Sequence, residues 1–196
     1  DVIEDVMIEA DAINQKTQQK TLGIGTIVHK LAEDWLKGLK VIEPENEIVA
    51  NCFKKFKDFW TSNKLKLLES EKLLYSEKGF CGTLDIVATD KSKNLILIDI
   101  KTSNGIFHNY CLQLHAYKYA YEEQTGNKIN KLCIVRLPKN DDDFESRILS
   151  YKPLHTRAFL GLLDCYKSLA LYNDQLKEYN ANKKRKNANV RKPKKK

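Results

Sequence analysis

The sequence GFCGTLDIVATDKSKNLILIDIKTS, Gly79 to Ser103, decides the fold. It contains two apolar segments, CGTLDIVAT at residues 81–89 and LILIDIKTS at residues 95–103, which are separated by the polar sequence DKSKN. A short polar break between two segments rich in β-branched residues is typical of an antiparallel hairpin. We therefore predict two adjacent strands here, and the preceding KLLYSE is predicted to add a third strand to an antiparallel meander.

Each of these two predicted strands carries one carboxylate, Asp85 in the first and Asp99 in the second. The two-residue period of a strand places Asp99 and Lys101 on one face. An unpaired charge costs several kcal/mol when buried, and two adjacent carboxylates repel unless they share a proton or a divalent cation. Mg²⁺ binds one or two carboxylates together with water and phosphate oxygens, so the pair is a candidate cation site. At this point a plain cross-strand ion pair remains the alternative.

The rest of the chain adds helices and two more strands. The predicted helices are residues 24–39, a second beginning just after Pro44, a third ending at Gly126 and a last one from 155 to 180; the predicted strands are 131–138 and 144–151. This order predicts an α/β (α+β) fold, with a central mixed sheet flanked by helices around one core. At 196 residues and 42% hydrophobic, the chain can bury such a core.

The positive charge is concentrated at the C-terminus. The last 14 residues, from Lys183, contain nine of the 34 Lys and Arg, which leaves 25 against 26 Asp and Glu in the rest of the chain. A basic run without apolar periodicity is disordered by composition and can bind phosphate through counterion release. We therefore predict one folded domain over residues 1–180 and a disordered basic tail over 181–196. A solubilising or targeting role for the tail is the alternative.

The five cysteines are far apart and include no CxxC pair, which indicates reduced thiols. No apolar run is long enough for a membrane span and no leader is visible, so we expect no membrane partner. The expected location is intracellular: cytoplasmic in a prokaryote or phage, nuclear or organellar in a eukaryote.

Four motifs in a fixed order resemble a known family. GTIVHKLAEDWLKG begins at Gly25, GFCGTLDIVA at Gly79, DIKTS at Asp99 and LQLHAY at Leu112. Together they resemble the PD-(D/E)XK nuclease superfamily, in particular its RecB-like exonuclease branch, which includes stand-alone phage exonucleases and the mitochondrial genome-maintenance exonuclease. The resemblance covers about residues 23–125 and implies a restriction-endonuclease-like core.

The resemblance also implies roles for individual residues. His29, Asp85 and Asp99 correspond to metal ligands, the Ile100 carbonyl completes the ligand set, and Lys101 is catalytic.

A further acid precedes the Gly-x-x-Asp turn in this branch. Glu71 falls at its place, although Glu69 and Glu77 compete for the role, and it completes a catalytic set with the two aspartates and the lysine. Gln113 and Tyr117 match a Gln-x-x-x-Tyr helix motif that approaches the metal site or the DNA.

The function implied by the resemblance is that of a DNA nuclease that needs Mg²⁺ or Mn²⁺. An exonuclease acting on DNA ends or on single strands, in replication, recombination or repair, is the favoured form. The cysteine pattern of iron–sulfur members is absent, so no such cluster is expected. Two alternatives stay open: a nucleic-acid-binding module of the same fold without activity, and a structure- or site-specific endonuclease. DNA is the expected partner, and a larger parent chain or replication and recombination proteins remain open as others.

Overall fold

The computed structural model of the protein describes residues 23–140, 142–149 and 153–190. The chain divides into two compact units, Asp1–Lys152 and Pro153–Lys196, which are described here one after the other. The predicted domain boundary after residue 180 therefore does not coincide with the division between the units.

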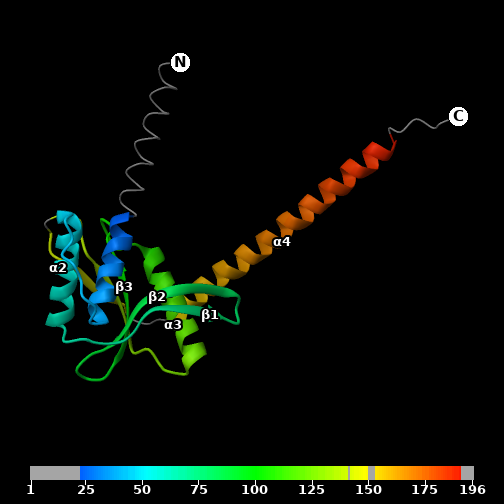
Figure 1. The fold of residues 1–196 in the computed structure, drawn as a ribbon. Helices are drawn as coiled ribbons and strands as arrows, with labels where there is room; N and C mark the ends of the chain where they lie inside the picture. Colours follow the sequence, from blue (N-terminus) through cyan, green and yellow to red (C-terminus); the bar gives the residue numbers. More distant parts are fainter. Residues whose placement is uncertain (1–22, 141, 150–152, 191–196) are drawn as a thin grey trace, which may run out of the picture. The chain divides into compact units, whose positions relative to one another are not determined.

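The first unit is built on one mixed sheet (Figure 1). Its strands are β1 (Lys66–Ser76), β2 (Phe80–Thr89), β3 (Leu95–Lys101), β4 (Lys131–Arg136) and β5 (Glu145–Leu149). They lie in the order β1-β2-β3-β4-β5, and every neighbouring pair is antiparallel except β3 and β4, which are parallel. A parallel pair needs a crossover, and the helix between β3 and β4 provides it. The predicted fold class is confirmed.

Two helices cover one face of this sheet. The first is helical over residues 23–36, and the second is α2 (Glu47–Ser62), whose apolar residues recur at helical spacing. The Asn46 side chain caps α2 by accepting a hydrogen bond from the Val49 N–H at 3.1 Å. Phe53 and Phe56 of α2 are buried against the side chains of β2, β3 and β4 that face the same way.

The crossover helix α3 (His108–Thr125) covers the opposite face. It ends as predicted at Gly126, which has a φ of 69° and donates its N–H to the Glu122 carbonyl, as a left-handed C-cap does. Leu114 and Tyr121 of α3 pack against the second face of the sheet. The sheet therefore has a helix layer on each side, and β3 is buried in its middle.

The strand β1 is longer than predicted, since it begins at Lys66 rather than near Lys72. It is an edge strand in which exposed side chains recur between partly buried or buried ones, so charged residues fit within it. It pairs with β2 from Phe80 to Thr89, whereas β3 pairs with β2 only from Ile86. The first half of β2 therefore belongs to a two-stranded hairpin that extends past the end of β3.

The second unit contains one helix, α4 (Pro153–Val190), of 38 residues. It runs ten residues beyond its predicted end, through residues 181–190 for which the composition predicts disorder. Lys, Arg and Ala are among the better helix formers, which explains why a basic sequence can remain helical. Residues 191–196 of the predicted tail lie outside the described residues.

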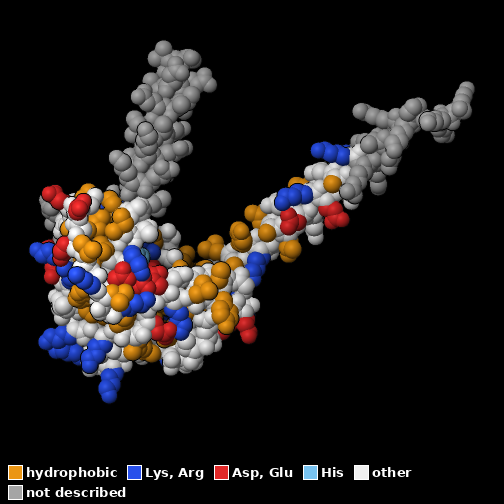
Figure 2. Space-filling view, viewed as in Figure 1, with side chains coloured by type: hydrophobic (Ala, Val, Ile, Leu, Met, Phe, Trp, Pro, Cys, Tyr) orange, Lys and Arg blue, Asp and Glu red, His pale blue; other side chains and the backbone are white. Residues whose placement is uncertain are grey.

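Large apolar side chains of α4 are exposed, and Figure 2 shows them along its length. They include Leu162, Tyr166, Leu169, Tyr172, Leu176 and Tyr179. No helix in the described part of the chain is both long enough and apolar enough to cross a membrane.

Candidate active site

Polar residues gather where β2 and β3 stop pairing. The last pair is Ile86 with Ile98, so Asp85 and Asp99 come next on the two strands. The Asp85 Oδ2 atom accepts a hydrogen bond from the Ile100 backbone N–H at 2.7 Å, in place of a backbone carbonyl. The carboxylate of Asp85 is therefore held against the backbone at the end of β3.

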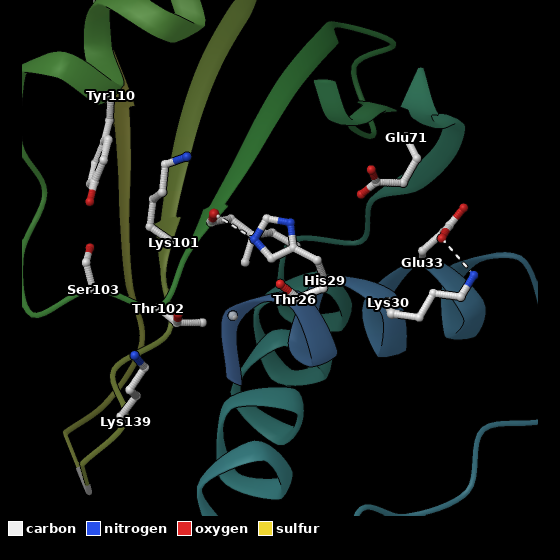
Figure 3. A pocket seen from close by; sticks show the side chains of 12 residues that line it. Thr26, His29, Lys30, Glu33, Glu71, Lys101, Thr102, Ser103, Tyr110 and Lys139 are labelled. Carbon is white, nitrogen blue, oxygen red and sulfur yellow. Dashed lines mark hydrogen bonds and ion pairs between the residues drawn. The ribbon is translucent and has the colours of Figure 1, made fainter. Parts of the chain in front are cut away.

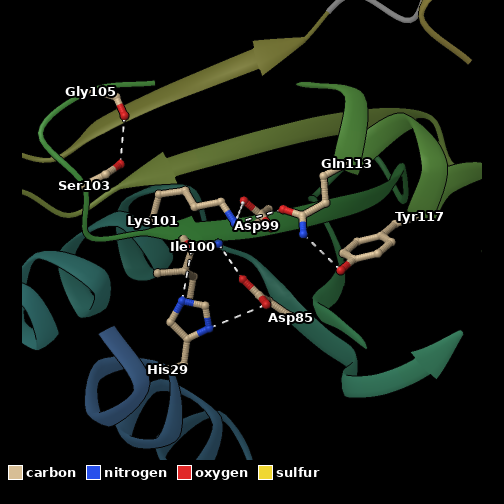
Figure 4. A network of polar contacts seen from close by, with 9 residues as sticks. All are labelled: His29, Asp85, Asp99, Ile100, Lys101, Ser103, Gly105, Gln113 and Tyr117. Atoms are coloured by element: carbon tan, nitrogen blue, oxygen red, sulfur yellow. Dashed lines mark hydrogen bonds and ion pairs between the residues drawn. The ribbon is translucent and has the colours of Figure 1, made fainter. Parts of the chain in front are cut away.

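His29 reaches the same place from the 23–36 helix (Figure 4). Its Nε2 atom lies 3.0 Å from the Ile100 carbonyl oxygen, and its Nδ1 atom lies 3.5 Å from Asp85 Oδ1. Burial lowers the pKa of His29, but Asp85 and then Asp99 raise it by more, so the net shift of the pKa is upward. The imidazole therefore lies in a site with an excess of negative charge.

Gly25 allows this helix to approach β3 closely. A Cβ atom at Gly25 would lie 3.1 Å from Thr102 Oγ1, which is tighter than ordinary van der Waals contact. His29 follows one helical turn later, on the same face. The Gly-x-x-x-His spacing of the sequence thus has a packing reason: the small residue lets the histidine reach the end of the strand.

Glu71 approaches the site from β1. Its neighbours Ser70 and Lys72 pair with the residues on either side of Asp85, so Glu71 lies across from that carboxylate. His29, Glu71 and Asp85 each offer one atom that could bind a metal, and these three atoms all lie within 4.8 Å of one another. Partial removal from water, and then Asp85, raise the pKa of Glu71. Glu71 also has a φ of 48°, an uncommon conformation for a non-glycine residue.

The two competing acids have other contacts. Glu69 forms an ion pair with Lys72 and accepts a hydrogen bond from the Tyr121 hydroxyl at 2.8 Å. Glu77 is exposed in the turn between β1 and β2. Of the three, Glu71 is the acid that the structure brings to His29 and Asp85.

Asp99 and Lys101 form the second half of the site. The Asp99 side chain is buried, with 2% exposure, and its two oxygens lie 3.0 and 2.8 Å from Lys101 Nζ. Burial, together with Asp85, raises the pKa of Asp99 to about 7 although Lys101 opposes the shift. Asp99 lies outside the cluster of His29, Glu71 and Asp85.

Gln113 and Tyr117 of α3 extend this half. The Gln113 Oε1 atom accepts a hydrogen bond from Lys101 Nζ at 3.0 Å, and its Nε2 atom donates to the Tyr117 hydroxyl at 3.1 Å. A Cβ atom at Gly82 would lie 2.6 Å from the Tyr117 ring, so only glycine leaves room for the tyrosine. The series of side-chain hydrogen bonds that links Asp99, Lys101, Gln113 and Tyr117 holds the lysine ammonium in one position (Figure 4).

An open cavity of about 680 Å³ lies at the site (Figure 3). His29, Glu71, Ile100 and Lys101 are among the residues that line it. The structure therefore gathers all the predicted site residues around one end of β3: His29, Glu71, Asp85, Asp99, Ile100, Lys101, Gln113 and Tyr117.

Some residues of the cavity were not predicted from the sequence. The Tyr110 ring lies 4.8 Å from Lys101 Nζ and lines the cavity with Lys139. Tyr110 is one of several tyrosines in α3, and the sequence alone does not distinguish it from them. Lys139 follows β4 in a loop, and nothing in a lysine-rich sequence marks it as a site residue. Only the fold brings these two side chains to the same cavity.

The part of the site formed by His29, Glu71, Asp85 and the Ile100 carbonyl fits a divalent cation. Octahedral Mg²⁺ with ligands at about 2.1 Å places adjacent ligand atoms about 3.0 Å apart. The His29 Nε2 atom lies 3.0 Å from the Ile100 carbonyl oxygen, which matches this spacing, whereas Asp85 Oδ1 lies beside the other ring nitrogen, Nδ1, at 3.5 Å. The Asp99 Oδ2 atom is buried and forms an ion pair with Lys101 Nζ at 2.8 Å, so the negative charge of Asp99 is already partly compensated. Burial, and then the nearby Asp85 carboxylate, raise the pKa values of Glu71 and Asp99, and a bound cation would oppose both shifts.

No family model matches the chain, and no curated protein matches it either. Among solved structures, the chain is similar to a protein from Eubacterium rectale described as a predicted exonuclease, with a TM-score of 0.47 and 11% identity over 76% of this chain and 66% of that one. It is also similar to a repair endonuclease from Pyrococcus abyssi, with a TM-score of 0.29 and 18% identity over 46% of this chain and 37% of that one. The chain thus spans less than two thirds of the length of either protein. At these values the similarities carry no argument about function, which has to be inferred from the site.

Proposed function

We propose that the protein is a metal-dependent nuclease of the PD-(D/E)XK superfamily, from its RecB-like branch, and that it hydrolyses phosphodiester bonds of DNA. One observation carries the proposal: His29 and Glu71, which cluster with Asp85, line an open cavity together with Lys101, a lysine held by a buried aspartate. Oxygen and imidazole ligands next to a fixed ammonium suit a reaction in which negative charge develops on a phosphate.

Each residue of the cluster has a proposed role. His29, Asp85, Glu71 and the Ile100 carbonyl would hold Mg²⁺ or Mn²⁺, and Asp99 would share in its coordination. When bound, such a cation polarises a phosphate oxygen and lowers the pKa of an attacking water. The carboxylates of Glu71 and Asp85, which cluster with His29, give the site the negative charge needed to hold a divalent ion.

The proposed role of Lys101 is to stabilise the charge of the reacting phosphate. Its Nζ atom donates to Gln113 Oε1 and is paired with Asp99, which favours the charged ammonium. An ammonium held in place before the reaction can stabilise developing charge without reorganisation. Tyr117 in turn accepts a hydrogen bond from Gln113, so it acts through that side chain.

An exonuclease acting on DNA ends or single strands is the favoured form of this activity. A site-specific endonuclease would need a separate base-reading element, and the sequence has no obvious zinc-finger or helix-turn-helix pattern. An inactive binding module would not need the complete set of acids, histidine and lysine.

The test is incubation of the protein with end-labelled single- and double-stranded DNA in Mg²⁺, Mn²⁺ or EDTA. An exonuclease shortens the strand progressively from an end and leaves circular DNA intact. A ladder of internal cuts would favour the endonuclease, and binding without cleavage in either metal would favour the inactive module. RNA of the same sequence serves as the control for the choice of nucleic acid.

A further inference from the structure

The cavity has two polar sides. Figure 3 shows Glu71 on one side and Lys139 on the other, with His29 and Lys101 between them. The first side holds Glu71, which clusters with His29 and Asp85 in the candidate cation site. The second side holds a lysine from the loop after β4 and the Thr102 side chain, which directly follows Lys101 in the sequence. A cation site and an ammonium on opposite sides of one cavity suit a ligand with more than one negative charge.

The loop that carries Lys139 is fastened to α2 at several points. Lys55 Nζ donates hydrogen bonds to the Pro138 carbonyl at 3.1 Å and to the Asn140 carbonyl at 2.6 Å, on either side of Lys139. The Asn51 side chain also donates to the Asn140 carbonyl, at 3.2 Å. The loop is therefore held on both sides of the residue that reaches the cavity.

Lys55 is 8% exposed, and a buried ammonium is costly unless hydrogen bonds compensate it. Its hydrogen bonds go to two backbone carbonyls of this loop, so the burial of its charge fixes the loop rather than the helix. A further hydrogen bond, from the Leu137 N–H to the Lys101 carbonyl at 2.8 Å, joins the loop to the end of β3. The backbones that carry Lys101 and Lys139 are thus tied directly to each other.

We propose that Lys139, together with the Thr102 hydroxyl, binds a second phosphate group of the nucleic acid strand whose scissile phosphate lies at the cation site. This inference rests on the proposed function. Lys139 is half-buried, and burial lowers the pKa of its ammonium, so an anion that replaces water around it gains more than at an open surface. Ser103 takes no direct part, since its hydroxyl already donates to the Gly105 carbonyl at 2.8 Å. Lys55 is a positioning residue for Lys139.

The second phosphate has two sources with the same chemistry. It is either a bridging phosphodiester next to the scissile bond or a terminal phosphate at the strand end. Oligonucleotides with a 5′-phosphate, a 3′-phosphate or hydroxyls at both ends separate the two, because only a terminal contact responds to the end group. Either result supports the proposal.

The first experiment compares Lys139→Ala with Lys91→Ala, which removes the same charge. Lys91 is exposed in the turn before β3, at the opposite end of that strand from Lys101. Binding of a fluorescent single-stranded oligonucleotide is measured in EDTA, where nothing is cleaved, at several salt concentrations. Lys139→Ala should weaken binding roughly tenfold and reduce the slope of log affinity against log salt by about 0.7. Lys91→Ala should change affinity less than about twofold.

The second experiment locates the contact. Single methylphosphonates, which remove the charge of one phosphate, are placed along the oligonucleotide in turn. At one position the wild type should lose affinity while Lys139→Ala loses none. Equal responses of the two proteins at every position, or equal weakening by Lys139→Ala and Lys91→Ala, would overturn the proposal.

The positioning role of Lys55 is tested by coupling. Lys55→Met should weaken binding in the wild type but not in a Lys139→Ala background, because its effect passes through that residue. A purely structural effect would be the same in both backgrounds. Asn51→Ala, which removes one exposed hydrogen bond of the loop, gives a milder version of the test if Lys55→Met fails to fold.

The outcomes also separate this inference from the proposed function. A protein that binds through Lys139 but cleaves DNA in no metal contradicts the nuclease and leaves the phosphate contact in place. A protein that cleaves DNA but responds equally to the two lysine substitutions contradicts the contact alone.

Discussion

Helices of the two units show the same apolar spacing but different burial. On α2, Phe53 and Phe56 have exposures of 2% and 0%, because the sheet covers them. On α4, Leu162, Leu169 and Tyr172 have exposures of 58% to 59%. The spacing of apolar residues therefore predicts that a segment is helical, but it does not show whether a partner surface covers its apolar side.

The residues of the candidate site are also divided unequally between the two units. The residues of the candidate site come from the 23–36 helix, β1, β2, β3 and α3, all in the first unit. Their positions depend on close packing, as at Gly25 and Gly82, where a Cβ atom would meet a neighbouring side chain. The second unit offers apolar side chains and positive charge on a single helix. The first unit is thus expected to determine turnover, and the second to affect only how strongly DNA is held.

The largest effects should come from the centre of the first unit. Asp99→Asn or Lys101→Ala should lower kcat by roughly 10²–10³-fold, because one removes a carboxylate from the site and the other removes the held ammonium. Without Lys101 the buried Asp99 should take up a proton, since its pKa is already raised to about 7, and the fold should survive. Single-turnover cleavage with Mn²⁺ measures the loss, and circular dichroism checks the fold.

The matched control for these substitutions is Lys91→Ala. It removes one exposed lysine far from the cavity and should leave kcat unchanged. Wild-type turnover by either site variant over a full Mn²⁺ titration would show that the reaction takes place elsewhere.

A stability comparison tests the difference in burial directly. Phe56→Ala should lower the free energy of unfolding by about 3–5 kcal/mol, because it removes a fully buried ring from the core. Leu169→Ala should change it by less than about 0.5 kcal/mol, as is usual for an exposed position. Urea unfolding of both variants gives the two values. A loss of more than about 2 kcal/mol for Leu169→Ala would mean that α4 is covered in solution.

Much of the fold could be predicted because its signals are local. The period of two in β2 and β3, Pro44 just before α2 and Gly126 at the end of α3 each act within a few residues. The length of β1 could not be predicted in this way, since an edge strand accepts charged residues that resemble a loop in the sequence. The helical end of α4 was missed because composition alone does not separate a basic helix from a disordered tail.

The candidate site shows the same limit. Asp85, Asp99 and Lys101 could be selected because a charge within an apolar strand requires a partner. Tyr110 and Lys139 could not, since their place at the cavity depends on contacts between elements distant in the sequence. For Lys139 the deciding contacts involve α2, more than 80 residues earlier in the chain.

Within the first unit, the two kinds of ligand should differ. Asp85→Asn should lower activity about tenfold more than His29→Ala, since a carboxylate contributes charge to cation binding and a neutral imidazole does not. Excess Mn²⁺ should restore His29→Ala more fully than Asp85→Asn. Metal titrations of cleavage measure both effects. Equal losses that no metal concentration restores would indicate that His29 does more than share in coordination.

The smallest effect is expected at the end of the second unit. Deleting residues 183–196 removes nine positive charges, so KM should rise and the slope of log affinity against log salt should fall, equally for all DNA sequences. The value of kcat should change less than twofold, because these charges bind the substrate and its transition state alike. A variant with the same nine positions changed to Gln keeps the length of the chain and separates charge from truncation. Unchanged salt dependence in both variants would favour a solubilising or targeting role, whereas a large fall in kcat would mean that the segment contributes to the catalytic site.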